Sequence, residues 1–161
     1  MNTPSLRSSG LLIACIAVPL FAGLIGSIAT IPAISSWYTI LIKPPLTPPN
    51  WVFGPVWTTL YILMGISLYL VVSKGTENKL VRLGMLLFAA QLIVNILWSF
   101  VFFGLHSPIL GLAIILILII LVLAMIYCYY QVSRIAAGLQ VPYIVWLCIA
   151  TYLNIMILVL N

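Results

Sequence analysis

Long runs of apolar residues, separated by short polar segments, dominate this chain. A helix that crosses the hydrocarbon core of a bilayer needs about 20 apolar residues. Five stretches of about that length are present, at residues 10–34, 51–73, 80–103, 108–130 and 141–160. The pattern predicts an all-α integral membrane protein, a bundle of five transmembrane helices that forms a single domain over residues 1–161.

Residues that favour helix starts stand at the beginning of three of these stretches. We expect Asn50 to cap the second helix and Ser107 to cap the fourth, with Pro108 at its first position. Pro142 suits the first turn of the fifth helix. The connections are short except for residues 35–50, which we call loop 1.

Loop 1 and the start of the second helix carry an unusual density of proline and tryptophan. Prolines 44, 45, 48, 49 and 55 stand between Lys43 and Trp57. Each proline fixes its own φ and lacks an N–H, so they cannot all lie inside a helix. We expect a stiff loop that brings aromatic side chains to one mouth of the bundle. Such a mouth favours capture of a flat, apolar molecule.

Composition agrees with a membrane protein and argues against a nucleic-acid partner. The 161 residues are 65% hydrophobic and 4% charged, with a mean hydropathy of +1.34, whereas soluble domains carry about 25% charged residues. The net charge of +5 comes from basic residues scattered at helix ends. They are typical of topology determinants.

The basic residues sort to one side of the predicted bundle. The side of the N-terminus receives Arg7, Lys74, Lys79, Arg82 and Arg134. The other side receives only Lys43. The positive-inside rule therefore predicts a cytoplasmic N-terminus and a loop 1 on the opposite face. The same sorting would hold in a eukaryotic organelle membrane, with the cytosol as the positive side.

Ionisable groups are nearly absent, which excludes several functions. Glu77 is the only acidic residue, it lies in a loop, and no charge falls in the middle of a span. Proton pumps, voltage sensors and intramembrane aspartyl proteases need such groups. The single histidine, His106, is more consistent with a wetted loop residue than with a catalyst. The three cysteines form no CxxC pair, so we expect inert buried thiols and no metal site.

Polar and aromatic residues recur at helical spacing and indicate inward faces. The third helix offers Gln91, Asn95, Trp98 and Phe102, with Ser99 beside them. The fifth helix offers Tyr143, Trp146, Ala150 and Asn154. In the second helix we expect the inward face to hold Trp51, Pro55, Thr58 and Gly65, with Trp57 and Tyr61 turned to the side. Three such faces favour a shared cavity with aromatic walls.

Structural roles for these residues remain open. Asn95 and Asn154 are also consistent with hydrogen bonds to each other or to backbone that hold helices together. Trp51 suits the aromatic belt of the membrane interface as well as a pocket. Small residues in the first helix, at positions 22, 23, 26 and 27, allow close helix approach, either inside the protein or in a dimer.

Ordered motifs across almost the whole chain resemble the translocator proteins, also called tryptophan-rich sensory proteins or peripheral-type benzodiazepine receptors. The longest is Pro48-Pro49-x-Trp51-x-x-Gly54-Pro55-Val56-Trp57-x-x-Leu60-Tyr61-x-x-Met64-Gly65. It is preceded by Trp37-Tyr38 and followed by Gln91-Leu92-x-x-Asn95-x-x-Trp98, Phe102-Phe103-Gly104 and Pro142-Tyr143-x-x-Trp146. The resemblance implies a five-helix bundle, a homodimer, and a pocket that loop 1 covers as a lid.

The resemblance also implies the ligands and the residues that bind them. Members of the family bind porphyrins, haem-pathway intermediates, sterols and synthetic isoquinoline carboxamides. The implied binding positions are Ser27, Thr30, Tyr38, Pro48, Phe53, Trp57, Asn95, Trp98, Ser99, Leu105, Trp146, Ala150 and Leu153. No cofactor is expected, and porphyrin or haem is expected as ligand.

Three functions follow from this resemblance. The first is a membrane receptor or sensor for tetrapyrroles and related flat hydrophobic molecules. The second is a light-dependent enzyme that degrades porphyrin, for which Trp57 and Trp146 would be the catalytic residues. The third is a transporter of tetrapyrroles or lipids. Sterol binding is not expected to follow the animal pattern, because no basic residue follows Tyr152 near the C-terminus. This departure from the animal members of the family favours a bacterial protein, and we therefore expect a bacterial inner membrane, or an organelle membrane if the source is eukaryotic.

Overall fold

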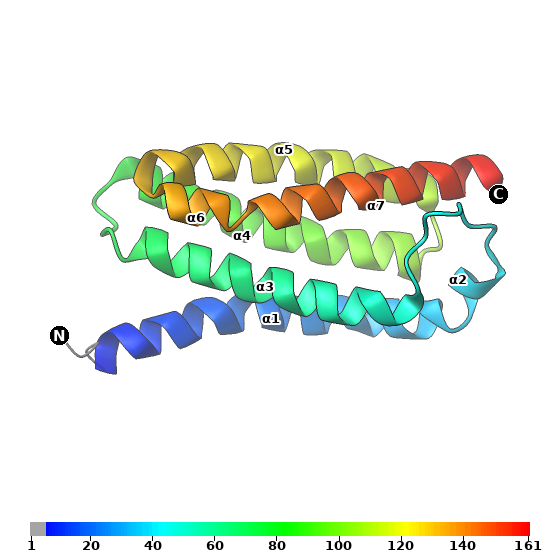
Figure 1. The fold of residues 1–161 in the computed structure, drawn as a ribbon, viewed down its shortest axis with the longest axis horizontal. Coiled ribbons are helices and arrows are strands. Elements are labelled where there is room, and N and C mark those ends of the chain that lie inside the picture. The colour runs from blue at the N-terminus through cyan, green and yellow to red at the C-terminus, as the bar shows by residue number, and fades with distance from the viewer. Residues whose placement is uncertain (1–5) are drawn as a thin grey trace.

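Five long helices run side by side in the computed structural model (Figure 1). They are α1 (Leu6–Ile34), α3 (Asn50–Val72), α4 (Lys79–Ser99), α5 (Pro108–Val132) and α7 (Val141–Leu160). All five are long and apolar enough to cross a membrane. The prediction of an all-α membrane protein with five spanning helices is therefore confirmed. Large apolar side chains such as Phe21, Ile28 and Ile120 point outward, as they do in contact with lipid.

The structure describes residues 6–161, and side chains from residue 8 onward. The prediction for the Arg7 side chain lies outside these described side chains. Lys74 in the connection between α3 and α4, Lys79 at the start of α4 and Arg134 at the start of α6 lie at the N-terminal end of the bundle. Loop 1, which contains Lys43, lies at the opposite end, beside the C-terminus (Figure 1).

Two of the predicted helix starts are confirmed and one is wrong. The Ser107 hydroxyl accepts a hydrogen bond from the Leu110 N–H, at 3.4 Å, and Pro108 opens α5. Pro142 lies in the first turn of α7. Asn50 does not cap α3: it is the first helical residue, and Pro49, in an extended conformation, takes the capping position without a side-chain bond.

Three short elements were not predicted. Helix α2 (Trp37–Ile40) lies within loop 1, and α6 (Arg134–Gly138) lies between α5 and α7. The end of α4 widens into a π-helical turn, η1 (Phe100–Gly104), where the Leu105 N–H reaches the Phe100 carbonyl at 2.9 Å. Segments of four or five residues are too short for a hydrophobic period to reveal.

The half of the bundle away from loop 1 is closely packed. A Cβ atom on Gly65 of α3 would lie 2.5 Å from the Ile16 Cα of α1, so only glycine permits this approach. Val71, Val81 and Tyr129 are fully buried in the same half. The Ser67 hydroxyl donates to the Ala136 carbonyl at 2.7 Å and joins α3 to α6. We call this region the packed half.

The expectation of buried cysteines holds for two of the three. Cys15 and Cys128 are buried, whereas Cys148 is exposed on α7. Its neighbour Leu147 faces the core instead. An apolar run shows that a residue lies in the membrane, but it does not say whether the side chain faces lipid or protein.

Candidate functional site

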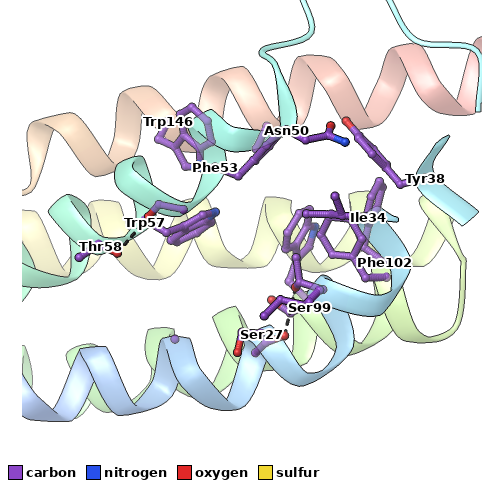
Figure 2. A pocket seen from close by; sticks show the side chains of 18 of the residues that line it. Ser27, Ile34, Tyr38, Asn50, Phe53, Trp57, Thr58, Ser99, Phe102 and Trp146 are labelled. Atoms are coloured by element: carbon purple, nitrogen blue, oxygen red, sulfur yellow. Dashed lines mark hydrogen bonds between the residues drawn. The ribbon is translucent and has the colours of Figure 1, made fainter. Parts of the chain in front are cut away.

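A cavity of about 670 Å³ lies in the half of the bundle next to loop 1, which we call the lid half. Helices α1, α3, α4 and α7, together with η1 and α2, supply its walls. Four of the five tryptophans line it: Trp51, Trp57, Trp98 and Trp146. Figure 2 shows Trp57 and Trp146 on one side of the space and Ser27 and Ser99 on another.

One aromatic cluster, the Trp57 cluster, forms the wall supplied by α3 and α7. The Trp57 ring stacks on Tyr61, with centroids 5.3 Å apart and an interplanar angle of 29°. Trp146 meets Trp57 edge to face at 6.4 Å, and Phe53 meets Trp146 in the same way at 5.8 Å. These are favoured geometries for aromatic pairs, so they hold the indoles in fixed orientations.

A second aromatic cluster, the Trp98 cluster, forms the wall supplied by α4 and η1. Trp98 stacks on Phe102, with centroids 5.1 Å apart and an angle of 12°, and meets Phe103 edge to face at 5.7 Å. Trp37 of the lid packs edge to face on Phe102 at 5.6 Å. Both consecutive phenylalanines of the widened turn line the cavity.

Tyr38 of α2 joins the two clusters at the lid. Its ring lies edge to face with Phe53 at 6.4 Å and with Phe103 at 5.9 Å. The side chain is 3% exposed. Burial raises the pKa of the Tyr38 phenol, which therefore stays protonated at neutral pH. The Lys43 ammonium lies 4.6 Å from the centre of this ring, a cation–π distance.

A buried hydrogen-bond network supports the Trp57 cluster from behind. The Tyr61 hydroxyl donates to the Asn95 Oδ1 at 3.0 Å, and the Asn95 Nδ2 donates to the Tyr143 hydroxyl at 3.0 Å. Tyr143 in turn donates to the Gln91 Oε1 at 3.1 Å. The network joins α3, α4 and α7. Of the alternatives for Asn95, the structure therefore favours a bond between helices, made to tyrosines rather than to Asn154.

Two contacts fasten loop 1 to the ends of neighbouring helices. The Asn161 side chain accepts from the Ile42 N–H at 3.0 Å and donates to the Ile42 carbonyl at 3.1 Å. Trp37 stacks on His106, with centroids 4.6 Å apart. His106 is exposed, as expected, but it packs on the lid rather than standing alone in water.

The cavity brings together ten of the thirteen binding positions that the family resemblance implied. They are Ser27, Thr30, Tyr38, Phe53, Trp57, Trp98, Ser99, Trp146, Ala150 and Leu153. Three others do not line it. Asn95 lies behind Tyr61 and Tyr143, Leu105 is 68% exposed, and Pro48 is partly exposed within loop 1.

The expected inward face of α3 is partly wrong. Trp51 and Thr58 line the cavity, but so do Trp57 and Tyr61, which were expected to turn aside. Pro55 lines a separate groove on the outer surface between α3 and α7. Trp57 and Tyr61 are four residues apart and share a face, a spacing that could have marked them as a pair.

Some lining residues were missing from the implied set. Tyr61 and Phe102 contribute rings, and Asn50 contributes an amide at the lid. Phe102 stands on the inward face predicted for the third helix, so its spacing from Trp98 was the available signal. For Asn50 the sequence offered only a misleading signal, because an asparagine before a helix suggests an N-cap.

The small residues of α1 are used within the chain. A Cβ on Gly23 would lie 2.3 Å from the Tyr61 ring, and one on Gly26 would lie 3.1 Å from the Ser99 hydroxyl. They let α1 approach α3 and α4 around the cavity. No group of three His, Cys, Asp or Glu side chains suited to a metal ion occurs among the residues that the structure describes.

Comparison with known proteins gives a consistent result. Residues 15–160 match the profile of the TspO/MBR family. The chain is 43% identical to the tryptophan-rich protein TspO of Chlorobaculum tepidum, over 91% of this chain and 93% of that protein. It is 42% identical to a protein of the same name from Archaeoglobus fulgidus, over 93% and 96% of the two chains. It is also 42% identical to the human translocator protein, over 73% of this chain and 70% of that protein.

Proposed function

Since this chain belongs to the TspO/MBR family of integral membrane proteins, we propose that it is a receptor or sensor that binds porphyrins and related flat hydrophobic molecules. The observation that carries this proposal is the cavity of about 670 Å³ in the lid half, with four tryptophans in its walls. Its size lies within the range of small-molecule sites, about 300–1,000 Å³.

The chemistry of the walls supports a flat aromatic ligand. Trp57 and Trp146 lie at 84° to each other, so they offer a ring face and a ring edge to the same ligand. Trp98 and Phe102 are nearly parallel, at 12°, and present a second stacking surface. Ser27 and Ser99 add polar contacts. In this proposal porphyrin or haem is a ligand, and no cofactor is required.

We also propose a bacterial inner membrane with a cytoplasmic N-terminus, since the basic residues cluster at that end. A homodimer is proposed from the resemblance to the family. The small residues of α1 pack within the chain, so the dimer would use another, lipid-facing surface. Labelling of single cysteines from either side of the membrane tests the orientation, and crosslinking in membranes tests the dimer.

Titration of the purified protein with protoporphyrin in the dark tests the binding proposal. We expect saturable quenching of tryptophan fluorescence, because the ligand would lie against several indoles. Trp98→Ala should weaken binding about tenfold, since an aromatic contact contributes about 1 kcal/mol beyond its buried area. Phe21→Ala, which alters an outward-facing ring of α1 that does not line the cavity, is the control. Absence of saturable quenching in the wild type would contradict the proposal.

The Trp57–Trp146 pair favours light-dependent porphyrin degradation as a second candidate. In this reaction light excites the bound porphyrin, an indole donates one electron to it, and dioxygen is the oxidant consumed in ring opening. Illumination of the complex should then bleach the porphyrin beyond a protein-free control. Trp57→Phe and Trp146→Phe should stop the bleaching while binding is largely kept. An unchanged absorbance spectrum under light would leave the receptor as the function.

Transport is a further alternative, and liposomes distinguish it. A transporter would move porphyrin across the membrane of vesicles that contain the protein, whereas a receptor would bind it without net flux. The absence of charged residues from the spans argues against ion coupling but not against passive passage.

A further inference from the structure

Polar groups gather where the lid meets the cavity. Tyr38 and Asn50 both line the cavity, and Figure 2 shows the Tyr38 hydroxyl and the Asn50 amide pointing toward each other at this edge. The Lys43 ammonium lies 4.6 Å from the centre of the Tyr38 ring. We call these three side chains the rim. Tyr38 and Asn50 bring a hydroxyl and an amide to the edge of the cavity, and Lys43, which does not line the cavity, places one positive charge against the Tyr38 ring.

The charge of Lys43 is not neutralised by an acidic side chain. The chain contains a single acidic residue, Glu77, and it lies in the connection between α3 and α4. That connection stands at the opposite end of the bundle from loop 1 (Figure 1). All other lysines and arginines fall outside loop 1, at positions 7, 74, 79, 82 and 134. Lys43 is therefore the one basic residue of loop 1, and loop 1 contains no acidic residue to pair with it.

The interior of the cavity differs from the rim. Its lining residues include no lysine, arginine, histidine, aspartate or glutamate. Transfer of an ionised group into such apolar surroundings costs several kcal/mol or more when nothing pairs with it. A ligand with both a flat ring system and an acidic group has one favourable orientation: rings inside, acid at the rim.

We propose that the rim formed by Lys43, Tyr38 and Asn50 is a carboxylate-binding subsite, and that this protein prefers ligands with a carboxylate beside the ring system to neutral ones. This inference rests on the proposed function, and it narrows the ligand class from flat apolar molecules to those that carry a carboxylate beside the ring system. Porphyrins with propionate side chains belong to this class, whereas neutral ring systems do not.

Each rim residue has a distinct role in this subsite. The Lys43 ammonium supplies the charge and is free to pivot on its four-carbon stem. The Tyr38 hydroxyl donates a hydrogen bond from a ring that Phe53 and Phe103 hold in place. The Asn50 amide, which is exposed and makes no cap bond in α3, adds a further donor. Donors of this kind form short, charge-assisted bonds with a carboxylate.

A comparison of an acid with its ester tests the subsite. Protoporphyrin and protoporphyrin dimethyl ester share one ring system and differ in charge. We expect the wild-type protein, in phosphatidylcholine nanodiscs at pH 7.5, to bind the acid about tenfold more tightly than the ester, since hydrogen bonds to charged groups contribute about 1.5 kcal/mol or more. Lys43→Gln should remove this preference and leave the affinity for the ester unchanged. Lys79→Gln, at the other end of the bundle, is the matched control.

Two results would overturn the inference. One is equal binding of acid and ester by the wild type. The other is a Lys43→Gln variant that loses affinity for both ligands alike, since lysine would then act only by holding Tyr38. Either result leaves porphyrin binding itself intact.

A second pair of probes separates the subsite from the porphyrin proposal. Pyrenebutanoic acid and its methyl ester are flat, fluorescent and smaller, and they carry the same acid-for-ester exchange. If neither porphyrin binds, the proposed porphyrin function fails. Preference for the pyrene acid that Lys43→Gln abolishes would still support the subsite, and its absence would refute the subsite as well.

Discussion

The packed half and the lid half are built from the same long helices, yet one is solid and the other hollow. In the packed half, glycine lets α1 and α3 approach until a Cβ on Gly65 would overlap Ile16. In the lid half, large rings on α3, α4 and α7 stand between the helices and enclose about 670 Å³. Since Gly23 and Gly26 also permit close approach of α1 beside the cavity, it is the large rings of α3, α4 and α7, rather than a change of fold, that distinguish the open half.

The largest expected effect is the loss of stability caused by a substitution in the packed half. Gly65→Ala adds a methyl group 2.5 Å from the Ile16 Cα and 2.8 Å from the Cys15 carbonyl, both backbone atoms. Overpacking of this kind costs about 1–3 kcal/mol. Thermal unfolding in detergent should therefore begin at a distinctly lower temperature.

Gly54→Ala is the matched control in the lid half. A Cβ there meets no atom within 4 Å, so we expect no loss of stability, and the higher helix propensity of alanine favours a gain of up to about 1 kcal/mol. Equal loss of stability in the two variants would show that the halves do not differ in packing as described.

The next effect concerns the network that borders the cavity. Asn95→Leu leaves the Tyr61 hydroxyl without its acceptor, and a buried group that loses its partner costs about 1–3 kcal/mol. We expect lower stability and weaker ligand binding, since Trp57 rests on Tyr61.

A double-mutant cycle distinguishes support from direct ligand contact at Asn95. If Asn95 acts through the tyrosine, Tyr61→Phe combined with Asn95→Leu should cost clearly less than the sum of the two single changes. Additive losses in binding affinity would instead indicate that Asn95 touches the ligand.

Ligand binding should slow amide hydrogen exchange in the lid half and leave it unchanged in the packed half. With porphyrin at about ten times its Kd, amide exchange in residues 35–49 should slow about tenfold, because binding stabilises the closed lid by mass action. Exchange around Gly65 and Tyr129 should not change. Hydrogen–deuterium exchange with mass spectrometry measures both regions at once, and uniform protection across the bundle would argue against a binding site confined to the lid half.

The smallest effect concerns the fastening of the lid. Asn161→Ala removes both hydrogen bonds to the Ile42 backbone, a net change of about 1 kcal/mol. Porphyrin should then dissociate about fivefold faster in stopped-flow measurements. Thr151→Ala, which removes a hydroxyl bond within α7 only, serves as control. Identical dissociation rates in the wild type and Asn161→Ala would mean that the lid does not limit release.

The sequence allowed the five long helices to be predicted because the length of an apolar run depends on the membrane and not on the neighbouring helices. The helical spacing of polar and aromatic residues was enough to predict most of the cavity-lining residues of α4, η1 and α7, as Trp98, Phe102 and Trp146 illustrate. The face of α3 did not follow, because both sides of its first turns carry aromatic or polar residues. There the choice depends on what α1 and α7 present, and local spacing does not contain that information.

Asn95 illustrates a second limit of prediction from sequence alone. Its amide points inward, as its position predicted, but an inward amide serves equally well to contact a ligand or to bind neighbouring tyrosines. The difference lies in where Tyr61 and Tyr143 arrive from other helices. The short elements α2, α6 and η1 escaped prediction for a related reason: tertiary contacts at the helix ends, not periodic sequence, determine them.

The number of residues in the π-helical turn η1 helps to set the orientation of the cavity residues that follow it. A π turn holds one residue more than an α turn, and each α-helical residue advances the chain by about 100° around the axis. If the segment Phe100–Gly104 became α-helical without loss of a residue, the residues beyond it would rotate by roughly that angle. Phe103 and the segment that leads to His106 would then leave their present partners. Deletion of one residue in the turn would compensate for the change of spacing and keep the chain beyond it in about its present orientation.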